Sequence, residues 1–491
     1  MSLFLAAVEI QPTMAWDGTV TILADGSIDP PTAPIQRNGD TYTLTASIYT
    51  EESGGDGVVI QRSNMTLEGA GYRVQGPYWD GSGIRPWYVQ NVTMRNMIVK
   101  GYVTGVNLLY CANVSVTGNT VGGNINGIEC HFTKNIVITQ NTVYQSEEVS
   151  DVSFITDTGS QIVNNNLSQT MMGIRLYNCT HESIYGNNIT AITNVGIQLD
   201  YSNYTRTYNN IIENNKNGIG LDYYSAYNSI FDNQIKTCNA TGIRFENCSS
   251  NSILRNTIVQ NKIGIFGRFS DSNIIAENNI TANIAEGVCL NYSSNDNIAD
   301  NNLIDNQNGV RLRHASFSIV HGNTMISNTQ YGIGLDSSSS HNDIHENTIQ
   351  QSYYGILIFA LCPDNTIYHN NLIDNTDQAN TMSSNTWDNG CEGNYWSNYN
   401  GVDTDGDGVG NTNIPWEGVD NCPLMNLYWI AADVNHDLQV GILDVVKITA
   451  AYGATRFSMY WNPHADIAEP YGKIDILDVV VCTRHYGEKC D

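Results

Sequence analysis

Acidic residues alternate with small ones in the stretch "DTDGDGVGN", residues 403–411. Carboxylate oxygens at this spacing suit Ca²⁺, and the glycines allow the backbone to fold around an ion. The three candidate ligands are Asp403, Asp405 and Asp407. The acidic twelfth residue of a helix–loop–helix calcium loop is missing, because Ile414 stands there, and Glu417 or Asp420 is the expected substitute. The alternative is an acidic linker that binds no ion.

A second acidic stretch, "DVNHDLQVGILD" at residues 433–444, matches the ligand positions of a twelve-residue calcium loop. The predicted ligands are Asp433, Asn435, Asp437, the carbonyl oxygen of Gln439, and Asp444. The apolar pattern after the loop predicts a helix over 442–451. Leu438 replaces the usual glycine and Gly441 the usual polar ninth residue, so calcium binding is expected to be weakened.

A third stretch repeats this plan, with "DILDVV" from Asp475 echoing "GILDVV" from Gly441. Its candidate ligands are Asp466, Asp475 and Asp478. The loop is one residue longer, and Ala468 and Pro470 replace expected ligands, so its calcium site is in doubt. The apolar pairs Ile442-Leu443 and Ile476-Leu477 predict either a docking patch or packing against the rest of the chain.

Further acidic residues recur at intervals of 22 and 24 residues, at Asp200, Asp222 and Glu246. If the chain stacks with this period, neighbouring carboxylates lie about 5 Å apart and repel by about 1 kcal/mol per pair even in water. Such a column favours a bound cation or a proton. With Arg244 or Arg268 neutralising a uronate, a hydrolase or lyase could use it.

Two other interpretations of the column remain open. In the first, the column is part of a solvated face that carries charges of both signs. In the second, it binds sugars without catalysis. The second is favoured by neighbouring tyrosines that suit stacking on sugar rings, namely Tyr177, Tyr201, Tyr223 and Tyr224.

An internal repeat must position these residues. A Gly-Ile-like phrase recurs, mostly every 22 to 24 residues, at Gly105, Gly127, Gly173, Gly196, Gly218, Gly242, Gly264, Gly287, Gly309, Gly332 and Gly355. An Asn-x-apolar marker keeps step with it at Asn119, Asn141, Asn165, Asn187, Asn209, Asn233, Asn256, Asn278, Asn301, Asn323, Asn347 and Asn370. The short alternating runs within each period predict three strands per repeat, that is, one coil of a right-handed parallel β-helix.

The repeat also predicts what each marker does. In "GIQLD" (196–200) the Ile and Leu side chains are expected to point inward and stack on those of adjacent coils. The glycine is expected to allow a tight corner before the strand. The asparagines are expected to form a buried ladder in which each amide bonds the next. The fold class is therefore all-β, a right-handed parallel β-helix of about 12 or more coils.

Composition limits the class of protein. Lys plus Arg number 22 and Asp plus Glu 49, giving a formal net charge of −27, which excludes the basic footprint that nucleic acids or anionic membrane surfaces require. No apolar run is long enough to span a membrane. The start, "MSLFLAAVEIQPTMA", is either a clipped signal peptide or an ordinary first strand.

Secretion is also favoured by eleven Asn-x-Ser/Thr glycosylation motifs, although an Asn-rich chain produces some by chance. They lie at Asn64, Asn91, Asn113, Asn166, Asn178, Asn188, Asn203, Asn239, Asn247, Asn279 and Asn291. Eleven cysteines form no zinc-type CxxC pair. Cys111, Cys179 and Cys248 occupy one repeat position about 14 Å apart, too far to pair, and are expected to be buried fillers. The more plausible bridges are Cys391–Cys422 and Cys482–Cys490.

The phrase "GI.L..S..N.I..N.I" resembles the β-helix repeats of the pectate-lyase-like superfamily over about residues 20–400. It is similar to secreted archaeal and bacterial "carbohydrate-binding and sugar hydrolysis" repeat proteins, and to the periplasmic β-helix family associated with nitrous-oxide-reductase copper-site maturation. No His/Met/Cys cluster stands out to support copper. The 433–491 stretch resembles a type I dockerin, which implies a cohesin-like docking partner.

The expected organisation is an N-terminal segment and cap (1–60), repeats (61–384), a cap with the Asp-rich calcium loop (385–427), and a dockerin-like domain (428–491). The preferred function is a secreted, extracellular or cell-surface β-helix that binds carbohydrate or serves as a scaffold and attaches through a calcium-dependent dockerin. The β-helix ends expose strand edges, so a cap shared between chains would produce homopolymeric filaments. The alternative is a polysaccharide lyase or glycoside hydrolase.

Overall fold

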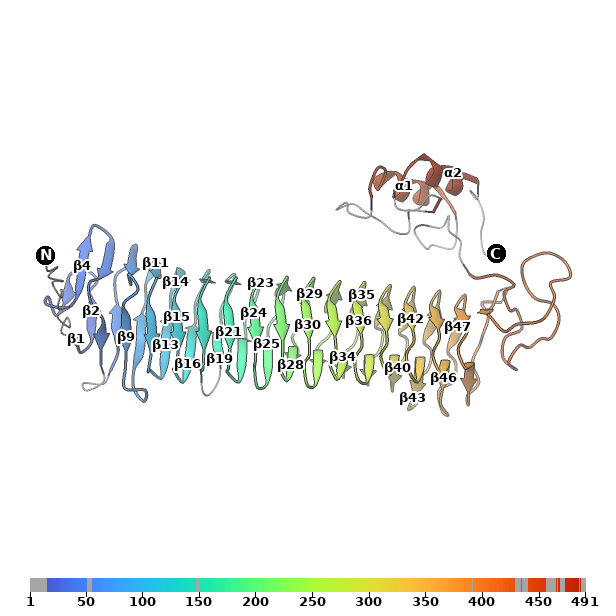
Figure 1. The fold of residues 1–491 in the computed structure, drawn as a ribbon, viewed down its shortest axis with the longest axis horizontal. Helices are drawn as coiled ribbons and strands as arrows, with labels where there is room; N and C mark the ends of the chain where they lie inside the picture. The colour runs from blue at the N-terminus through green and yellow to red at the C-terminus, as the bar shows by residue number, and fades with distance from the viewer. Residues whose placement is uncertain are drawn as a thin grey trace, which may run out of the picture.

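The computed structural model describes residues 16–50, 55–146, 150–390, 392–428, 434, 440–455, 465, 467–468, 473–484 and 486. These residues form a right-handed parallel β-helix of about 15 turns, followed by the helices α1 (Ile442–Ala450) and α2 (Ile476–Arg484) (Figure 1). The all-β repeat fold is confirmed, and the number of turns agrees with the predicted 12 or more coils.

Three sheets run the length of the β-helix, and each coil contributes one strand to each sheet. Sheet A contains β1 Trp16–Asp17, β6 Ile48–Tyr49, β9 Arg73–Gln75, β12 Ile98–Lys100, β15 Thr120–Gly122, β18 Thr142–Tyr144, β21 Asn166–Ser168, β24 Asn188–Thr190, β27 Ile211–Glu213, β30 Gln234–Lys236, β33 Thr257–Val259, β36 Asn279–Thr281, β39 Asn302–Ile304, β42 Thr324–Ile326, β45 Thr348–Gln350, β48 Asn371–Ile373 and β50 Tyr395–Trp396.

Sheet B has the longest strands and contains β2 Val20–Ile22, β3 Ile28–Asp29, β7 Val58–Ile60, β10 Ser82–Pro86, β13 Thr104–Leu109, β16 Asn126–His131, β19 Ser150–Ile155, β22 Met172–Tyr177, β25 Val195–Asp200, β28 Asn217–Asp222, β31 Thr241–Glu246, β34 Ile263–Arg268, β37 Glu286–Asn291, β40 Asn308–Arg313, β43 Tyr331–Asp336, β46 Tyr354–Ile358 and β49 Asp377–Thr381.

Sheet C contains β4 Ile35–Asn38, β5 Thr41–Leu44, β8 Met65–Glu68, β11 Gln90–Arg95, β14 Ala112–Thr117, β17 Val137–Thr139, β20 Gln161–Val163, β23 Ser183–Tyr185, β26 Arg206–Tyr208, β29 Ser229–Phe231, β32 Ser252–Leu254, β35 Ile274–Ala276, β38 Asn297–Ala299, β41 Ile319–His321, β44 Asp343–His345 and β47 Thr366–Tyr368. Described strands pair in parallel with the next coil, apart from the antiparallel pairs β2–β3 and β4–β5.

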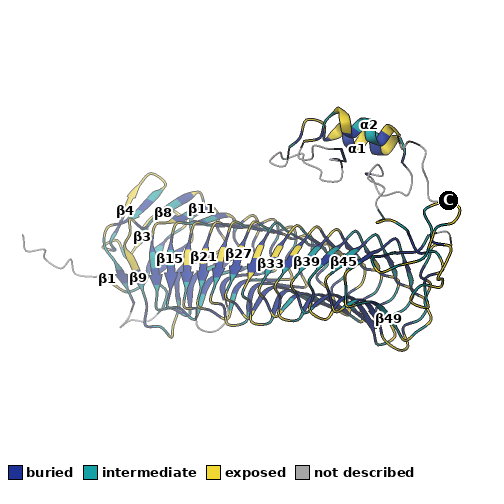
Figure 2. Cartoon of the chain, turned by 45° about the vertical axis from the view of Figure 1, so that its right-hand side comes forward, coloured by how far each residue is buried: buried dark blue, intermediate teal, exposed yellow. Residues whose placement is uncertain are grey.

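Alternation along the sheet B strands separates the core from the surface. In β25, Ile197 and Leu199 are fully buried, and their partners in β28 are Ile219 and Leu221, which confirms the predicted inward stack. Figure 2 shows the same pattern along the β-helix, with the interior buried and the turns exposed. Burying an aliphatic side chain contributes roughly 1.5–3 kcal/mol. One continuous hydrophobic core therefore extends from Val20 to Trp396.

The buried asparagine ladder is present. Asn187 donates its side-chain amide to Asn210 Oδ1 at 3.0 Å, and Asn210 donates to Asn233 at 3.0 Å. The ladder residue in this coil is Asn210, so the marker at Asn209 is wrong by one residue, because Asn209 lies in the exposed turn with φ 53°. A second ladder of the same kind passes through Asn228 and Asn251 between sheets B and C. Buried polar groups are thus satisfied from coil to coil.

The phrase glycines act differently from the prediction. Gly196 lies inside β25 rather than in a corner, and it is not among the glycines with positive φ. A Cβ on Gly196 would lie 2.7 Å from the carbonyl oxygen of Gly218 and 2.9 Å from a methyl group of Ile212. The glycine is required because neighbouring strands and the sheet A side chain approach it closely.

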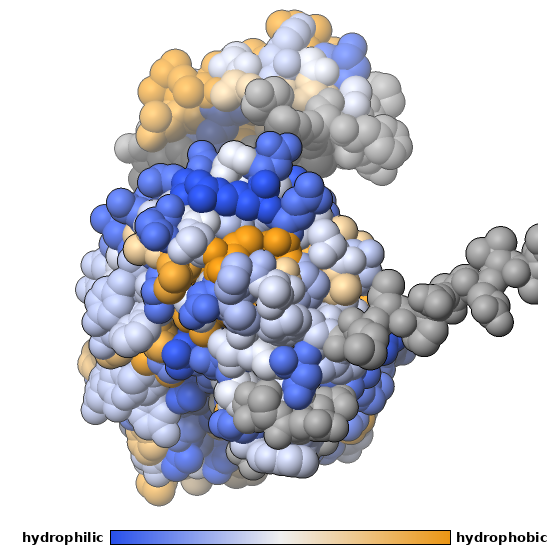
Figure 3. Space-filling view, turned by 90° about the vertical axis from the view of Figure 1, so that its left-hand side faces the viewer, coloured by the Kyte–Doolittle hydropathy of each residue, from blue (hydrophilic) through white to orange (hydrophobic). Residues whose placement is uncertain are grey.

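The two ends of the β-helix differ from its middle. Parallel pairing already joins β1 to β6 and β2 to β7, so coils begin within residues 1–60, the segment predicted to include the N-terminal cap. Figure 3 views the N-terminal end, where a hydrophobic patch lies among hydrophilic residues. At the other end, Asp420 accepts hydrogen bonds from Trp396 Nε1 at 2.7 Å and from the Asn394 backbone at 2.9 Å, which anchors the segment after the last coil.

The helix pair has a hydrophobic core of its own, which includes Val440, Ile448, Ile474 and Cys482. The predicted helix over 442–451 is present, with Ala451 as its C-cap. Neither described helix is long and apolar enough to cross a membrane.

Candidate functional site

The acidic column lies on the outer face of sheet B. Asp200 and Asp222 are register partners in β25 and β28, and Glu246 ends the next strand, β31. The carboxylates are not bare. Gln198 Nε2 donates to Asp200 at 2.8 Å and to Asp222 at 3.0 Å, so one amide bridges two coils.

Arginines neutralise the same column. Arg244 lies 2.5 Å from Asp222 and 3.3 Å from Glu246, and Arg268 lies 3.5 Å from Glu246. Arg175 Nε lies 3.5 Å from Asp200. Burial raises the pKa of Asp222, while Arg244 opposes this shift. The structure thus brings together all five candidate residues, as an ion-paired, hydrogen-bonding strip rather than a cluster of free acids.

Exposed aromatic side chains flank this strip at the corner between sheets B and C. We define the aromatic corner as the stacked rings of Tyr201 and Tyr223, and of His181, Tyr204 and Tyr227. A separate, partly exposed stack at the far ends of sheet C strands consists of Tyr185, Tyr208 and Phe231. Ring centroids within a column of this corner are 5.1–5.3 Å apart and the ring planes differ by 8–17°, so successive coils present rings nearly in parallel. Tyr201 directly follows Asp200, and Tyr223 directly follows Asp222, so the stacking surface adjoins the polar strip.

The backbone conformation at this corner disfavours the aromatic residues that occupy it. Tyr201, Tyr204, Tyr223 and Tyr227 have φ between 49° and 58°, a left-handed conformation that costs a residue other than glycine roughly 1–2 kcal/mol. A stacked pair recovers about 0.5–1.5 kcal/mol, which is less than the strain of the two residues that form it. Stability of the fold alone therefore does not account for these residues.

The other two corners provide an internal comparison. Their left-handed positions in the same coils hold Asn164, Gly186, Asn209 and Asp232 at one corner and Gln169, Ala191, Asn214 and Thr237 at the other. Small and polar residues thus satisfy the same backbone requirement elsewhere. Among the left-handed positions of these coils, aromatic residues are concentrated at the corner between sheets B and C, as expected of a surface that binds a ligand.

Sequence reasoning noted Tyr177, Tyr201, Tyr223 and Tyr224 but missed the other rings of the corner. A signal was available, since aromatic residues stand five residues after the phrase glycine in several coils. They are Tyr110, Phe132, Tyr201, Tyr223, Phe269 and Tyr292. Tyr224 is exposed but lies outside the defined stacks.

The Asp-rich loop brings its three carboxylates together. One oxygen each of Asp403, Asp405 and Asp407 lies within 4.8 Å of the others. Asp403 accepts backbone hydrogen bonds from Gly406 at 2.6 Å and Gly408 at 2.9 Å, and these bonds lower its pKa. Among the described residues this is the one group of three His, Cys, Asp or Glu side chains placed to share an ion.

The helix pair places two predicted ligands in equivalent positions. Asp444 and Asp478 are both buried and accept 2.7 Å hydrogen bonds from the backbones of Gly441 and Asp475 respectively. Asp478 also accepts bonds from Ile467 and Ala468, at 2.7 and 2.8 Å. Both helices thus start in the same way, as their sequence similarity predicts. The predicted ligands Asp433, Asn435, Asp437, Gln439 and Asp466 lie outside the described residues.

The apolar pairs on the two helices are exposed to solvent. Ile442, Leu443, Ile476 and Leu477 have exposed fractions of 60%, 58%, 57% and 45%. Large apolar side chains exposed at equivalent positions of both helices form a surface that a partner could cover.

None of the glycosylation motifs has a buried asparagine. Asn203 and Asn291 are partly buried and the other nine are exposed, so the motifs are accessible and glycosylation stays a prediction. Cys111, Cys179 and Cys248 are buried, as expected, and burial raises the pKa of Cys179 and Cys248 to about 12. Cys391 and Cys490 lie outside the described residues, so neither predicted bridge is tested.

The repeat matches a protein-family model described as "Periplasmic copper-binding protein (NosD)" over residues 37–222, 208–283 and 267–401. This match covers most of the chain, which therefore belongs to the NosD family of periplasmic β-helix proteins.

Solved structures with a related fold include the periplasmic alginate epimerase AlgG (13% identity, 76% of this chain and 84% of that chain, TM-score 0.35). The mannuronan C-5 epimerase AlgE4 A-module of Azotobacter vinelandii is also similar (13%, 76% and 90%, TM-score 0.37). A DFA-IIIase from Arthrobacter chlorophenolicus covers 62% of this chain and 81% of its own at 11% identity (TM-score 0.32). These weak likenesses establish no activity for this chain. No curated protein matches it significantly.

Proposed function

We propose that this protein is an extracytoplasmic polysaccharide-binding β-helix, with the glycan chain lying along the aromatic corner. The observation that carries this proposal is the set of exposed rings, stacked at the coil spacing in a backbone conformation that disfavours them. A tyrosine offers a flat apolar face for the C–H side of a sugar ring and a hydroxyl group for hydrogen bonding. Because the rings repeat from coil to coil, the surface suits a polymer.

The adjacent polar strip supplies the other half of sugar recognition. Asp200, Asp222 and Gln198 present hydrogen-bonding groups beside the rings, and arginines balance the acidic charge. This pairing of an apolar face with polar groups fits a neutral or mildly acidic glycan. It disfavours nucleic acid, since the chain carries a net charge of −27.

A polysaccharide lyase or glycoside hydrolase is the alternative. Here Asp222 is the best candidate acid or base, since burial raises its pKa, but its contact with Arg244 opposes that role. The geometry therefore favours binding over catalysis.

We also propose that the C-terminal stretch is a calcium-dependent docking module of the dockerin type. The buried, equivalent Asp444 and Asp478 and the exposed apolar pairs support a duplicated module with a docking face. Its partner would be a cohesin-like domain or a neighbouring subunit. The Asp403 loop is proposed as a separate calcium site at the end of the β-helix.

Copper does not fit the described residues. Copper favours imidazole, thiolate and thioether ligands, whereas the one cluster of potential ligands is made of carboxylates. His321 and His345 stack in neighbouring coils with ring centroids 5.2 Å apart, and no third described His, Cys or carboxylate joins them to share an ion. The proposed function therefore does not involve copper.

The test is a screen of the full-length protein against uncharged and acidic polysaccharides by affinity electrophoresis. Each glycan that retards the protein is then assayed for new reducing ends and for unsaturated products. We expect retardation by at least one polysaccharide with no product formed. Failure to bind any polysaccharide would contradict the proposal, and turnover that Asp222→Asn abolishes would establish the enzyme instead.

A further inference from the structure

Two further groups of stacked rings lie between sheets B and C, one on each side of the aromatic corner along the β-helix. In both groups, rings from successive coils have centroids 4.2–5.2 Å apart. The N-terminal ring block consists of Tyr88, Tyr110 and Phe132, and the C-terminal ring block consists of Phe269, Tyr292 and His314.

Both ring blocks repeat the observation on which the proposed function depends. Their residues occupy the repeat position that Tyr201 and Tyr223 occupy in the middle coils, in the turn after a sheet B strand. All six have φ between 47° and 55°, the left-handed conformation that disfavours them. The five tyrosine and phenylalanine side chains are 44–66% exposed. Exposed rings at a disfavoured backbone position thus recur well beyond the aromatic corner.

Polar residues hold the same position in the coils between the groups of rings. Thr156 and Asn178 separate the N-terminal ring block from Tyr201, and Asn247 separates Tyr223 from the C-terminal ring block. These three polar residues are exposed and have φ between 54° and 57°. Their hydroxyl and amide groups can form hydrogen bonds with a sugar chain that passes from one group of rings to the next.

The rings define a surface of fixed length. Eleven sheet B strands, from β10 to β40, precede the positions from Tyr88 to His314. At about 4.8 Å per coil, the intervals between them add up to about 48 Å. An extended chain of pyranose rings advances by a similar distance per ring, so the surface matches roughly eleven sugar residues. The next coil has Ser337 at this position, so the series of rings ends at His314.

We propose that the two ring blocks and the aromatic corner bind one linear polysaccharide chain at the same time, with the chain parallel to the β-helix axis. This inference rests on the proposed function and adds the ligand class, an extended, unbranched glycan of about ten or more residues. Each group of rings alone holds a few sugars weakly. Once one group is occupied, the next meets the same chain at a high effective concentration. Short oligosaccharides are therefore weak ligands.

The test measures how affinity depends on chain length. It uses the full-length protein without N-glycans, because Asn178 and Asn247 lie in glycosylation motifs. The polysaccharide that retards the protein is cut into oligosaccharides, and the tetramer, octamer and dodecamer are titrated by isothermal calorimetry. We expect the dodecamer to bind at least about thirtyfold more tightly than the tetramer, and longer chains to gain little more.

The possible outcomes separate this inference from the proposed function. A smaller gain for the dodecamer, which the larger number of binding positions on a longer chain would explain, overturns the inference and leaves the proposed function standing. If no polysaccharide binds at all, the proposed function fails and this inference fails with it.

Ring deletions in the two ring blocks locate the contacts. Two double variants, Tyr110→Ala/Phe132→Ala and Phe269→Ala/Tyr292→Ala, each remove two rings of one block. Each should weaken binding of the dodecamer about tenfold or more. The tetramer should bind nearly as before, because one intact group of rings is enough to hold it.

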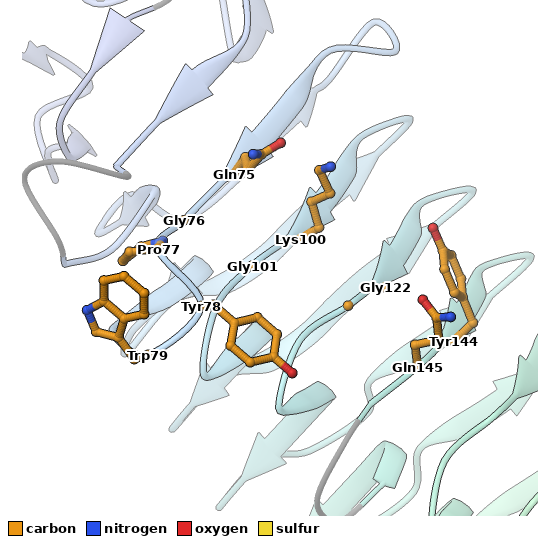
Figure 4. A pocket seen from close by; sticks show the side chains of 11 residues that line it. Gln75, Gly76, Pro77, Tyr78, Trp79, Lys100, Gly101, Gly122, Tyr144 and Gln145 are labelled. Carbon is orange, nitrogen blue, oxygen red and sulfur yellow. The ribbon is translucent and has the colours of Figure 1, made fainter.

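The controls remove exposed aromatic side chains that lie away from this surface. Trp79 is 76% exposed beside a hollow at the corner between sheets A and B (Figure 4). Tyr185 and Tyr208 are stacked on sheet C. Trp79→Ala and Tyr185→Ala/Tyr208→Ala should bind the dodecamer as the wild type does. Wild-type dodecamer affinity in either ring-block variant, or equal losses in the controls, would overturn the assignment.

Discussion

Asp296 replaces an asparagine in the buried ladder between sheets B and C. Its Oδ1 accepts hydrogen bonds from the backbone and side chain of Asn273, at 2.8 and 3.2 Å. Burial raises the pKa of Asp296 to about 7. A protonated carboxyl group has the shape of the amide that it replaces in the ladder. Because burial disfavours the charged carboxylate, the folded protein binds this proton more tightly than the unfolded chain does.

The expected consequence is a loss of stability as the pH rises. The folded pKa lies above the unfolded value, so the stabilisation is complete below about pH 4 and is lost as the pH rises towards 7. Asp296→Asn should remove this dependence and raise the free energy of unfolding at pH 8 by roughly 2–4 kcal/mol. The melting temperature at pH 5 and pH 8 measures it, with exposed Asp305→Asn as control. An unchanged difference between the two pH values would contradict the assignment.

At the scale of single residues, the sequence was informative where a repeat position has one physical role. The inward Ile197 and Leu199, the buried Cys179 and the ladder asparagines follow from periodicity. The glycine role was wrong, because a close approach between strands looks the same in sequence as a tight turn. The arginine contacts were only partly predictable, since side-chain direction on a flat sheet is set by neighbouring coils.

At the scale of elements, acidic residues of the C-terminal helices have two possible roles, as hydrogen-bond acceptors for the backbone and as calcium ligands. Asp478 accepts three backbone hydrogen bonds and holds its loop against α2. Removing it leaves buried donors unsatisfied, which costs about 1–3 kcal/mol each whether or not calcium is present.

Calcium should therefore distinguish the two loops in the full-length protein. We expect calcium to raise the melting temperature of the helix-pair transition, and Asp437→Ala to remove that increase. Asp478→Ala should lower the transition both with calcium and with chelator. Differential scanning calorimetry of the three proteins provides the comparison. A helix-pair transition that chelator leaves unchanged in the wild type would exclude the calcium proposal.

The helix starts were predictable because an acidic residue three positions into a helix has a capping role that sequence reveals. The aromatic corner was less predictable from the sequence. Tyr204 and Tyr227 are separated by 23 residues, and only the coil geometry shows that their rings are stacked 5.3 Å apart. The left-handed backbone conformation of these turn residues could not be predicted either, because tyrosine rarely adopts it.

At the scale of the molecule, the fold was the most predictable feature, since many in-phase markers each constrain the same coil. About 15 turns agree with the prediction of about 12 or more coils. The first coils carry no marker because they lack the phrase and are built from β1, β2 and the hairpins. The family assignment agrees with this repeat, while the individual ligands depend on surface positions that the repeat leaves free.

Assembly is a prediction at this scale. The ends of a β-helix expose strand edges unless they are covered, and the N-terminal end also carries a hydrophobic patch (Figure 3). If caps are shared between chains, electron microscopy of the native protein should show end-to-end filaments whose formation increases with concentration. Monodisperse monomers at high concentration, measured by light scattering, would count against filament formation.

The central claim is that a polysaccharide lies along the aromatic corner, and ring deletion tests it most directly. Two double variants each remove one pair of exposed stacked rings, Tyr201→Ala/Tyr223→Ala and Tyr204→Ala/Tyr227→Ala. These four side chains are exposed, so their removal leaves the packing of the core unchanged. Gln169→Ala/Asn214→Ala is the matched control, because it changes the same left-handed backbone positions at another corner. Affinity electrophoresis in the retarding polysaccharide should show binding weakened about tenfold or more in both tyrosine variants and unchanged in the control. Wild-type retardation in both tyrosine variants would contradict the account.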